Sequence, residues 1–152
     1  MTGSTMLAAL KELGGLEFLQ RVARGELPNL AIGTPLNFAL ASVEKGHVTF
    51  SGIPDASHYN FIETVHGGYA ATLLDTAMAC AILSTLPPGQ TFTTLEFKIN
   101  FVRGMTHETG RVAAEGNIIH AGKRIATADG RLVDRNGKLL AHGSTTCMVL
   151  DP

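Results

Sequence analysis

The chain has 152 residues, of which 45% are hydrophobic and 16% are charged, and its formal net charge is −1. A chain of this size and composition folds as one globular unit with a real core, which excludes an intrinsically disordered protein. The near-zero net charge argues against a nucleic-acid-binding surface. The segment Met1–Gly15 is too polar for a signal peptide, so we expect a cytoplasmic protein. Two cysteines, Cys80 and Cys147, do not make a disulfide framework.

The N-terminal segment precedes the main domain. Residues Met1–Gly25 carry a loose apolar stripe that predicts a helix, with a break or bend at Gly14-Gly15. The stretch from Gly25 to Pro35 is rich in glycine and proline and is predicted to be a linker. We therefore divide the chain into a helix and linker over residues 1–35 and a main domain over residues 36–152. The sequence leaves open whether the helix caps a dimer or packs on the sheet.

The main domain is organised around His66–Leu86, which is apolar nearly all the way round. A helix of this kind is predicted to be buried, because no side of it gains from facing water. Asp75 is the only formal charge between Glu63 and Glu96. A buried carboxylate is costly to desolvate unless it has a charged or hydrogen-bonding partner or serves a function. The polar residues of this helix make it a poor membrane span, and Pro87-Pro88-Gly89 is expected to end it.

Strands are predicted on both sides of this helix. Residues 36–43 and 47–53 form a predicted hairpin before it, and a loop over 54–65 follows them. After it, Thr94–Phe101 alternates strictly, with Leu95, Phe97, Ile99 and Phe101 on one face. Three more strands are predicted at about 110–120, 124–134 and 139–150, and Asn136-Gly137 is a strong hairpin signal between the last two.

This order of elements predicts an α+β domain in which an antiparallel sheet of about six strands curls around one long helix. Such a sheet covers only one side of the helix. The plainest cover for the other side is a second copy of the chain, so we expect an obligate homodimer at least.

At this point the chain resembles a known family. The segment Asn60-Phe61-Ile62-Glu63-Thr64-Val65-His66-Gly67-Gly68, followed by Leu73-Leu74-Asp75-Thr76-Ala77, is similar to the hotdog-fold acyl-CoA thioesterases of the phenylacetate-degradation (PaaI-like) type. The resemblance covers roughly residue 36 to the end and includes the strand order. It implies a hotdog fold, hydrolysis of an acyl-CoA thioester to free acid and CoA, and a homotetramer built from dimers. Coenzyme A is then part of the substrate, and no separate cofactor is expected.

The resemblance implies a mechanism with which the local chemistry agrees. Asp75 acts either as general base on water or as nucleophile, and the sequence leaves both open. Gly67 and Gly68 let a substrate approach the backbone at a helix start, where N–H groups polarise a carbonyl. Burial is expected to raise the pKa of Asp75. Asp75 follows Gly67 by eight residues, roughly 12 Å along a helix axis, which is too far to serve one carbonyl. The family places these two groups on different subunits, so we expect a shared site.

Other residues are assigned supporting roles by the resemblance. Asn60 places the attacking water or the carbonyl, although an Asx turn is the structural alternative. His66 is expected to orient the loop or the thioester. Either Thr93 or Thr94 is expected to bring a hydroxyl to Asp75. The family also binds nucleotide phosphates near the turn between the middle strands.

Three basic residues are candidates for those phosphates, namely Arg103, Lys123 and Arg124. Solvated hairpin charges explain each of them nearly as well. Cys80 is expected to be core packing, because it lacks an activating base. No metal site is predicted, since the remaining histidines show no ligand spacing with carboxylates or cysteines: His47, His58, His107 and His142.

Two alternatives to catalysis stay open. In the structural one, Asp75 pairs with a buried partner and His66-Gly67-Gly68 is only a capped helix start. In the functional one, the chain is a non-catalytic acyl-CoA or ligand-binding module of the same fold. A hydratase is disfavoured because no histidine follows Asp75 in the helix. The acyl group, aryl or medium aliphatic, is left open, with candidates for its tunnel at Phe61, Tyr69, Met78, Leu83 and the apolar strand residues.

Overall fold

A computed structural model describes residues 3–151, so the first two residues of the predicted N-terminal helix lie outside the described range. It contains three α-helices and six strands within that range, and these have the following bounds. The helices are α1 (Gly3–Leu13), α2 (Gly15–Ala23) and α3 (Gly67–Leu83). The strands are β1 (Phe38–Glu44), β2 (His47–Gly52), β3 (Thr91–Phe101), β4 (Val112–Ala121), β5 (Ile125–Asp134) and β6 (Leu139–Leu150). No helix within residues 3–151 is long and apolar enough to cross a membrane.

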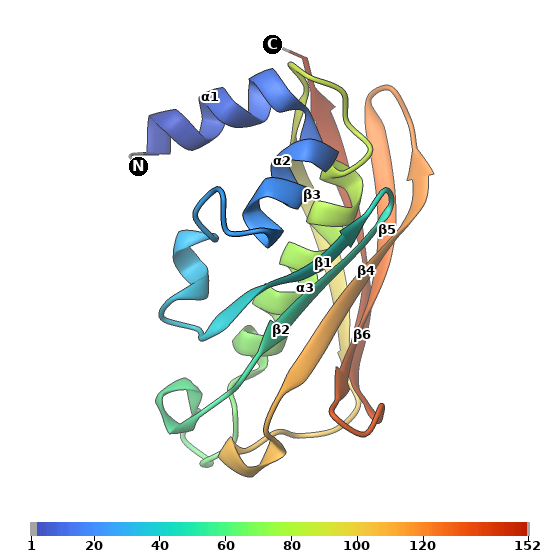
Figure 1. Cartoon of the computed structure of the whole chain (residues 1–152). Helices are drawn as coiled ribbons and strands as arrows, with labels where there is room; N and C mark the ends of the chain where they lie inside the picture. Colours follow the sequence, from blue (N-terminus) through green and yellow to red (C-terminus); the bar gives the residue numbers. More distant parts are fainter. Residues whose placement is uncertain (1–2, 152) are drawn as a thin grey trace.

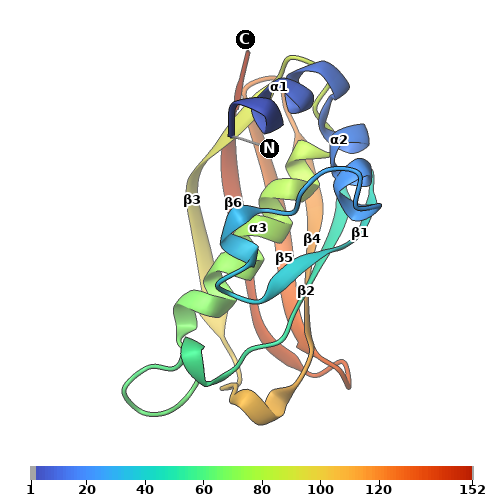
Figure 2. The same ribbon diagram turned by 60° about the vertical axis from the view of Figure 1, so that its left-hand side comes forward.

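The strands form one antiparallel sheet in the order β1-β2-β4-β5-β6-β3. Figures 1 and 2 show this sheet curled around α3, with α1 and α2 near the C-terminal end of α3. The predicted fold, a curled antiparallel sheet around one central helix with an added N-terminal helix, is therefore confirmed. β1 and β3 are the two edges of the sheet, so β3 carries an unpaired side.

A row of glycines lets α3 lie directly on the sheet. Gly116 pairs with Gly130, and Gly130 pairs with Gly143, so the row crosses β4, β5 and β6. A Cβ added at Gly116 would lie 2.1 Å from the carbonyl oxygen of Ala77. One added at Gly130 would lie 2.8 Å from Cγ of Met78. At Gly116 the helix backbone thus approaches the sheet more closely than any side chain would permit, whereas at Gly130 the Met78 side chain fills the space.

α3 is shorter than predicted at its end. The helix stops at Leu83, and Ser84 caps it. The Ser84 hydroxyl donates to the carbonyl of Ala81 and accepts from the N–H of Gly46 at 2.7 Å in the β1–β2 turn. Just after the helix, the carbonyl of Leu86 accepts a hydrogen bond from the N–H of Gly15. Because of these tertiary hydrogen bonds, the helix ends at Leu83, three residues before the predicted end at Leu86.

The N-terminal segment breaks at Gly14, as predicted, where the backbone has a φ of 76°. α2 buries Phe18 and Leu19 and packs against β1 and α3. A Cβ at Gly15 would lie 1.7 Å from the carbonyl oxygen of Leu83, so α2 begins in contact with the end of α3. Within one chain, this segment therefore packs on the body of the domain.

The strict alternation predicted for Thr94–Phe101 is wrong at one point. Thr94 pairs with Cys147 and Glu96 pairs with Thr146, so Leu95 is an extra residue that faces no partner. Such a β-bulge changes which side chains share a face. The helix-facing side chains of β3 are therefore Phe92, Thr94, Phe97, Ile99 and Phe101, which pair with the inward-facing positions of β6.

Candidate active site

Asp75 lies near the middle of α3 and faces β3. The hydroxyl of Thr94 donates to Oδ1 of Asp75 at 3.3 Å. The Asp75 side chain is half-buried and takes part in no ion pair within the described residues. Burial raises the pKa of this carboxyl above its usual value, and the Thr94 hydrogen bond partly offsets that rise. A carboxylate in this setting is a stronger base than an exposed one.

The structure distinguishes between the two candidate threonines. Thr93 is exposed and pairs with the exposed Met148, on the face of the sheet away from α3. Thr94 points to the helix because the bulge at Leu95 inverts the alternation at this place. Thr94, and not Thr93, brings a hydroxyl to Asp75.

α3 is not covered on every side by its own chain, as expected for a sheet that covers only one side of the helix. The positions that stay partly exposed form one stripe along the helix: Gly67, Gly68, Ala71, Thr72, Asp75 and Thr76. All of these except Asp75 are small, and they follow a helical repeat. Asp75 therefore lies at the border between the face of α3 that contacts the edge strand β3 and the side that the sheet of the same chain leaves open.

The start of α3 offers one backbone donor. His66 caps the helix, and its Nδ1 accepts from the N–H of Gly68 at 2.8 Å. The N–H of Gly67 has no hydrogen-bond partner within residues 3–151. At a helix N-terminus this free donor carries a partial positive charge. Of the two predicted glycines, only Gly67 is available to polarise a carbonyl, and His66 orients the helix start.

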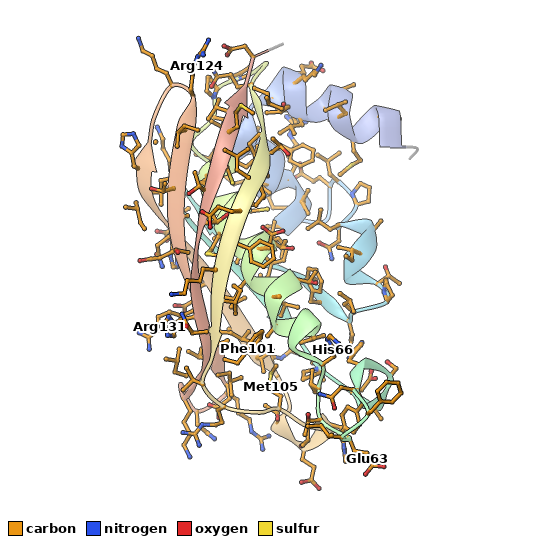
Figure 3. All side chains as sticks on the ribbon, turned by 180° about the vertical axis from the view of Figure 1, so that it is seen from behind. Glu63, His66, Phe101, Met105, Arg124 and Arg131 are labelled. Atoms are coloured by element: carbon orange, nitrogen blue, oxygen red, sulfur yellow. The ribbon has the colours of Figure 1, made fainter. Side chains whose placement is uncertain are left out.

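A cleft of about 260 Å³ lies beside that donor. Its walls are Val65, Gly67, Ala70, Phe101, Val102, Arg103, Gly104, Met105 and Leu140. Figure 3 shows His66, Phe101 and Met105 near one another at this end of the molecule. Phe101 is one of the apolar strand residues offered from the sequence for the acyl tunnel, whereas Met105 was not assigned to the site.

The two glycines are explained first by neighbouring side chains. A Cβ at Gly67 would lie 3.1 Å from the ring of Phe101, and a Cβ at Gly68 would lie 2.9 Å from Nδ1 of His66. These contacts are another reason for the two glycines, beside the expected approach of a substrate to their backbone.

Asn60 serves its own loop. Its Oδ1 accepts from the N–H groups of Ile62 and Thr64, at 3.0 and 3.3 Å, and its Nδ2 donates to the hydroxyl of Thr64. This is the Asx turn that the sequence offered as the structural alternative. It holds a tight loop in which Glu63 adopts a φ of 60° and from which Phe61 projects fully exposed. The residue thereby shapes the segment that leads to His66.

The three basic candidates do not meet within one chain. Arg103 lines the cleft beside Gly67. Lys123 and Arg124 lie in the β4–β5 hairpin, and Figure 3 shows Arg124 at the opposite end of the sheet from Phe101. No cluster of three or more His, Cys, Asp or Glu side chains within residues 3–151 is arranged to hold a metal ion. Cys80 and Cys147 are both free and buried.

Three of the residues that the sequence offered for the acyl tunnel do not line the cleft. Tyr69, Met78 and Leu83 are buried in the core between α3 and the sheet, and none of them borders the cleft. Periodicity could not separate a helix face that packs on a sheet from one that lines a ligand site.

Comparisons with known proteins agree with this arrangement. The sequence model of the thioesterase superfamily matches residues 63–141, just over half of the chain. No curated protein matches. Among solved structures, a Streptococcus mutans protein bound to acetyl-CoA is 27% identical, with a TM-score of 0.69 over 76% of this chain and 90% of that one. A phenylacetic acid degradation-related protein from Ralstonia eutropha is 26% identical, with a TM-score of 0.76 over 86% of this chain and 98% of that one.

The PaaI protein of the E. coli phenylacetic acid degradation operon shares the fold at 23% identity, with a TM-score of 0.76 over 87% of this chain and 93% of that one. The matched segment contains both Gly67 and Asp75, and the sheet wraps α3 as in a hotdog fold. The chain therefore belongs to the thioesterase superfamily and is a thioester hydrolase of the PaaI-like hotdog type.

Proposed function

We propose that the protein hydrolyses an aryl- or medium-chain acyl-CoA to the free acid and CoA, at active sites that each combine two copies of the chain. The observation that carries this proposal is the separation of the two reactive groups. Asp75 is tied to Thr94, whereas Gly67 touches Phe101, seven residues further along β3. Thr94 and Phe101 are roughly 20 Å apart along the strand, and Asp75 and Gly67 themselves are roughly 12 Å apart along α3. One chain therefore holds a base and a carbonyl-binding donor that do not serve each other.

A second copy joined through β3 would bring them together. β3 is a long edge strand with exposed apolar side chains at Leu95, Phe97 and Phe101, which is a template for pairing. Two-fold antiparallel pairing about the middle of β3 sets the start of one strand beside the end of the other. Asp75 and Thr94 of one copy then face Gly67 and Phe101 of its partner. The same contact covers the open stripe of α3. We further propose that two such dimers form a homotetramer.

In this arrangement the thioester carbonyl accepts a hydrogen bond from the Gly67 N–H of one protomer. Asp75 of the other takes a proton from water as the water oxygen attacks the carbonyl carbon. The C–S bond then breaks, and CoA leaves as a thiolate that takes up a proton. Direct attack by the Asp75 carboxylate, through a mixed anhydride, uses the same placement. One backbone donor of this kind is worth about 3 kcal/mol of transition-state stabilisation in other enzymes.

Support for a CoA thioester comes from the acetyl-CoA bound to the Streptococcus mutans protein and from the basic residues. The β4–β5 hairpin lies at the Thr91 end of the sheet, because Ile125 pairs with Met148 and Thr91 pairs with Leu150. Antiparallel pairing of β3 would set that end of one protomer beside the cleft of its partner. We propose that Arg103 of one protomer and the Lys123-Arg124 pair of the other bind the nucleotide phosphates.

The cleft fits the acyl end of such a substrate. Its volume of about 260 Å³ and its mostly apolar walls suit a phenyl ring or a short to medium chain, and Arg103 is the charged residue among those walls. The non-catalytic alternative has no observation in its favour, since Asp75 is neither fully solvated nor paired with a cation within the described residues.

The decisive test is complementation between two inactive variants. Asp75→Asn removes the base. Gly67→Pro removes the N–H at the first helical position, where proline is tolerated, and His66 already has a backbone (φ −58°, ψ 137°) that a following proline accepts. Like alanine, it also adds a Cβ 3.1 Å from the Phe101 ring. Gly67→Ala keeps the N–H and is the matched control. Hydrolysis is followed by thiol release over aryl and straight-chain acyl-CoAs.

If the site is shared, mixed dimers regain one intact site of two, so equal co-expression restores about a quarter of wild-type activity. A site confined to one chain would restore none, and the shared-site proposal would fall. If the wild type cleaves no thioester but acyl-CoA raises its melting temperature, the protein is a binding module instead. If Asp75→Asn retains the full rate, Asp75 has no role in the chemistry.

A further inference from the structure

Two buried side chains of β6 lie directly behind Asp75 and Thr94. The Sγ of Cys147 is 3.8 Å from the hydroxyl of Thr94 and 4.0 Å from the hydroxyl of Thr145. Thr145 in turn donates to the carbonyl of Glu96 at 2.9 Å. Thr145 and Cys147 are 2% and 0% exposed, so neither group exchanges these partners for water. The four side chains form a chain of polar contacts that ends on the Asp75 carboxylate.

The hydrogen bond from Thr145 to the carbonyl of Glu96 stabilises the β-bulge that orients Thr94 toward Asp75. Downstream of the bulge, odd-numbered residues of β3 face the helix, and upstream of it even-numbered ones do. If pairing were regular throughout, Thr94 would face away from α3. The extra residue, Leu95, is followed by Glu96, whose carbonyl is held by the Thr145 hydroxyl across the strand gap. A buried side chain on a neighbouring strand thus fixes the register break that brings Thr94 to Asp75.

The directions of these bonds are also fixed. An ionised Asp75 only accepts hydrogen bonds, so the hydroxyl of Thr94 donates its hydrogen bond to Asp75. The hydroxyl of Thr145 donates its hydrogen bond to the carbonyl of Glu96. Each hydroxyl oxygen then has only acceptor capacity left for Cys147. The thiol of Cys147 is therefore the donor in these contacts, and the hydroxyl oxygens of Thr94 and Thr145 are the acceptors. Burial raises the pKa of both Cys80 and Cys147, so both thiols stay protonated where Asp75 ionises.

We propose that Thr145 and Cys147 are positioning residues for the hydrolytic reaction: they hold the β3 bulge and the Thr94 hydroxyl, and through Thr94 they set the ionisation of Asp75. This inference rests on the proposed role of Asp75 as the reacting carboxylate. The titratable groups that interact with this cluster are Cys80 on α3, Cys147 on β6 and Glu96 on β3.

Thr145→Val removes the hydroxyl and keeps the shape, and Thr145→Ser returns a hydroxyl. Thr146→Val is the matched control, because Thr146 is the next residue on β6, faces the opposite side of the sheet and pairs with the same Glu96. The first readout is the pKa of Asp75 itself, measured by carbon-13 NMR of the side-chain carboxyls and assigned with Asp75→Asn. The second is the pH profile of kcat/KM.

Freed from Thr145, the bulge relaxes and Thr94 leaves Asp75. The Asp75 pKa should then rise, the acidic limb of the profile should move to higher pH, and kcat/KM should fall about fivefold, as expected for one net hydrogen bond. Thr145→Ser should restore all three quantities, and Thr146→Val should leave them unchanged. Cys147→Ala should shift the same pKa in the same direction.

The inference is overturned if Thr145→Val loses stability or rate while the Asp75 pKa and the acidic limb stay in place, since Thr145 would then be ordinary core packing. The NMR readout needs no turnover, so it also separates the two ideas. A pKa that moves in a protein that cleaves no thioester would sustain the positioning role and refute the proposed function.

Discussion

The contact between α3 and the sheet predicts a large effect for Gly116→Ala. The added methyl group would lie 2.1 Å from the Ala77 carbonyl oxygen and within 2.6 Å of the Met78 nitrogen, all of it rigid helix backbone. Real contacts of this kind stay above 3.0 Å, so α3 must move away from β4 by about 1 Å. Overpacking of this kind costs about 1–3 kcal/mol, which outweighs the roughly 0.4–1 kcal/mol that alanine gains over glycine by restricting the unfolded chain.

Urea unfolding and thermal melting at fixed protein concentration measure this cost. For a chain of this size we expect a melting temperature about 3–10 °C lower. The activity should fall as well, because the Asp75–Thr94 hydrogen bond is already 3.3 Å long. Gly104→Ala is the control, since its added methyl group meets no atom within 4 Å. A Gly116→Ala protein as stable as Gly104→Ala would refute the close seating of α3.

Three further outcomes follow from the structure. The pKa of Asp75 in the folded protein lies above its unfolded value of about 3.9, so the folded state binds the carboxyl proton more tightly than the unfolded state does. Ionisation of Asp75 therefore lowers the unfolding free energy as the pH rises from the unfolded to the folded pKa. Asp75→Asn should therefore raise the melting temperature at pH 7–8, with the gain vanishing toward pH 3; a constant difference across pH would contradict this. His66→Ala removes the acceptor that caps α3 and should lower the unfolding free energy by about 1 kcal/mol, whereas Asn at this position should recover most of it in the same denaturation assay. Burial raises the pKa of Cys80 to about 12 and also raises that of Cys147, so the native protein should consume no thiol reagent at pH 8 during an assay, while the denatured chain should expose both thiols.

The elements with strong local signals were predictable from the sequence. The apolar run after His66 predicted α3, and the Asn136-Gly137 turn predicted the β5–β6 hairpin, because both depend on residues close together in the chain. Asp75 stood out for the same reason, as a lone charge within an apolar helix. The one-sided cover of this helix gave the expectation of a second copy, and the family resemblance added the role of Gly67 and a site shared between copies; both remain proposals.

Other features depend on contacts between distant segments. The choice between Thr93 and Thr94 is decided by a bulge whose fastening residue, Thr145, lies some 50 positions away in sequence. The separation of Arg103 from Arg124 depends on how the sheet is folded, which charge type alone does not reveal. The end of α3 is likewise set by Ser84 binding the β1–β2 turn.

The glycine row beneath α3 limits how the enzyme can change its acyl preference. At Gly116, where helix backbone rests on strand backbone, there is no side chain to trim or enlarge, so mutation at this contact cannot raise α3 in small steps. Selection for longer or shorter acyl groups would therefore leave α3 in place and act on the cleft wall opposite it. That wall is residues 101–105, where Phe101, Val102 and Arg103 are exposed and Gly104 has open space around it. New specificities should arise in this short segment.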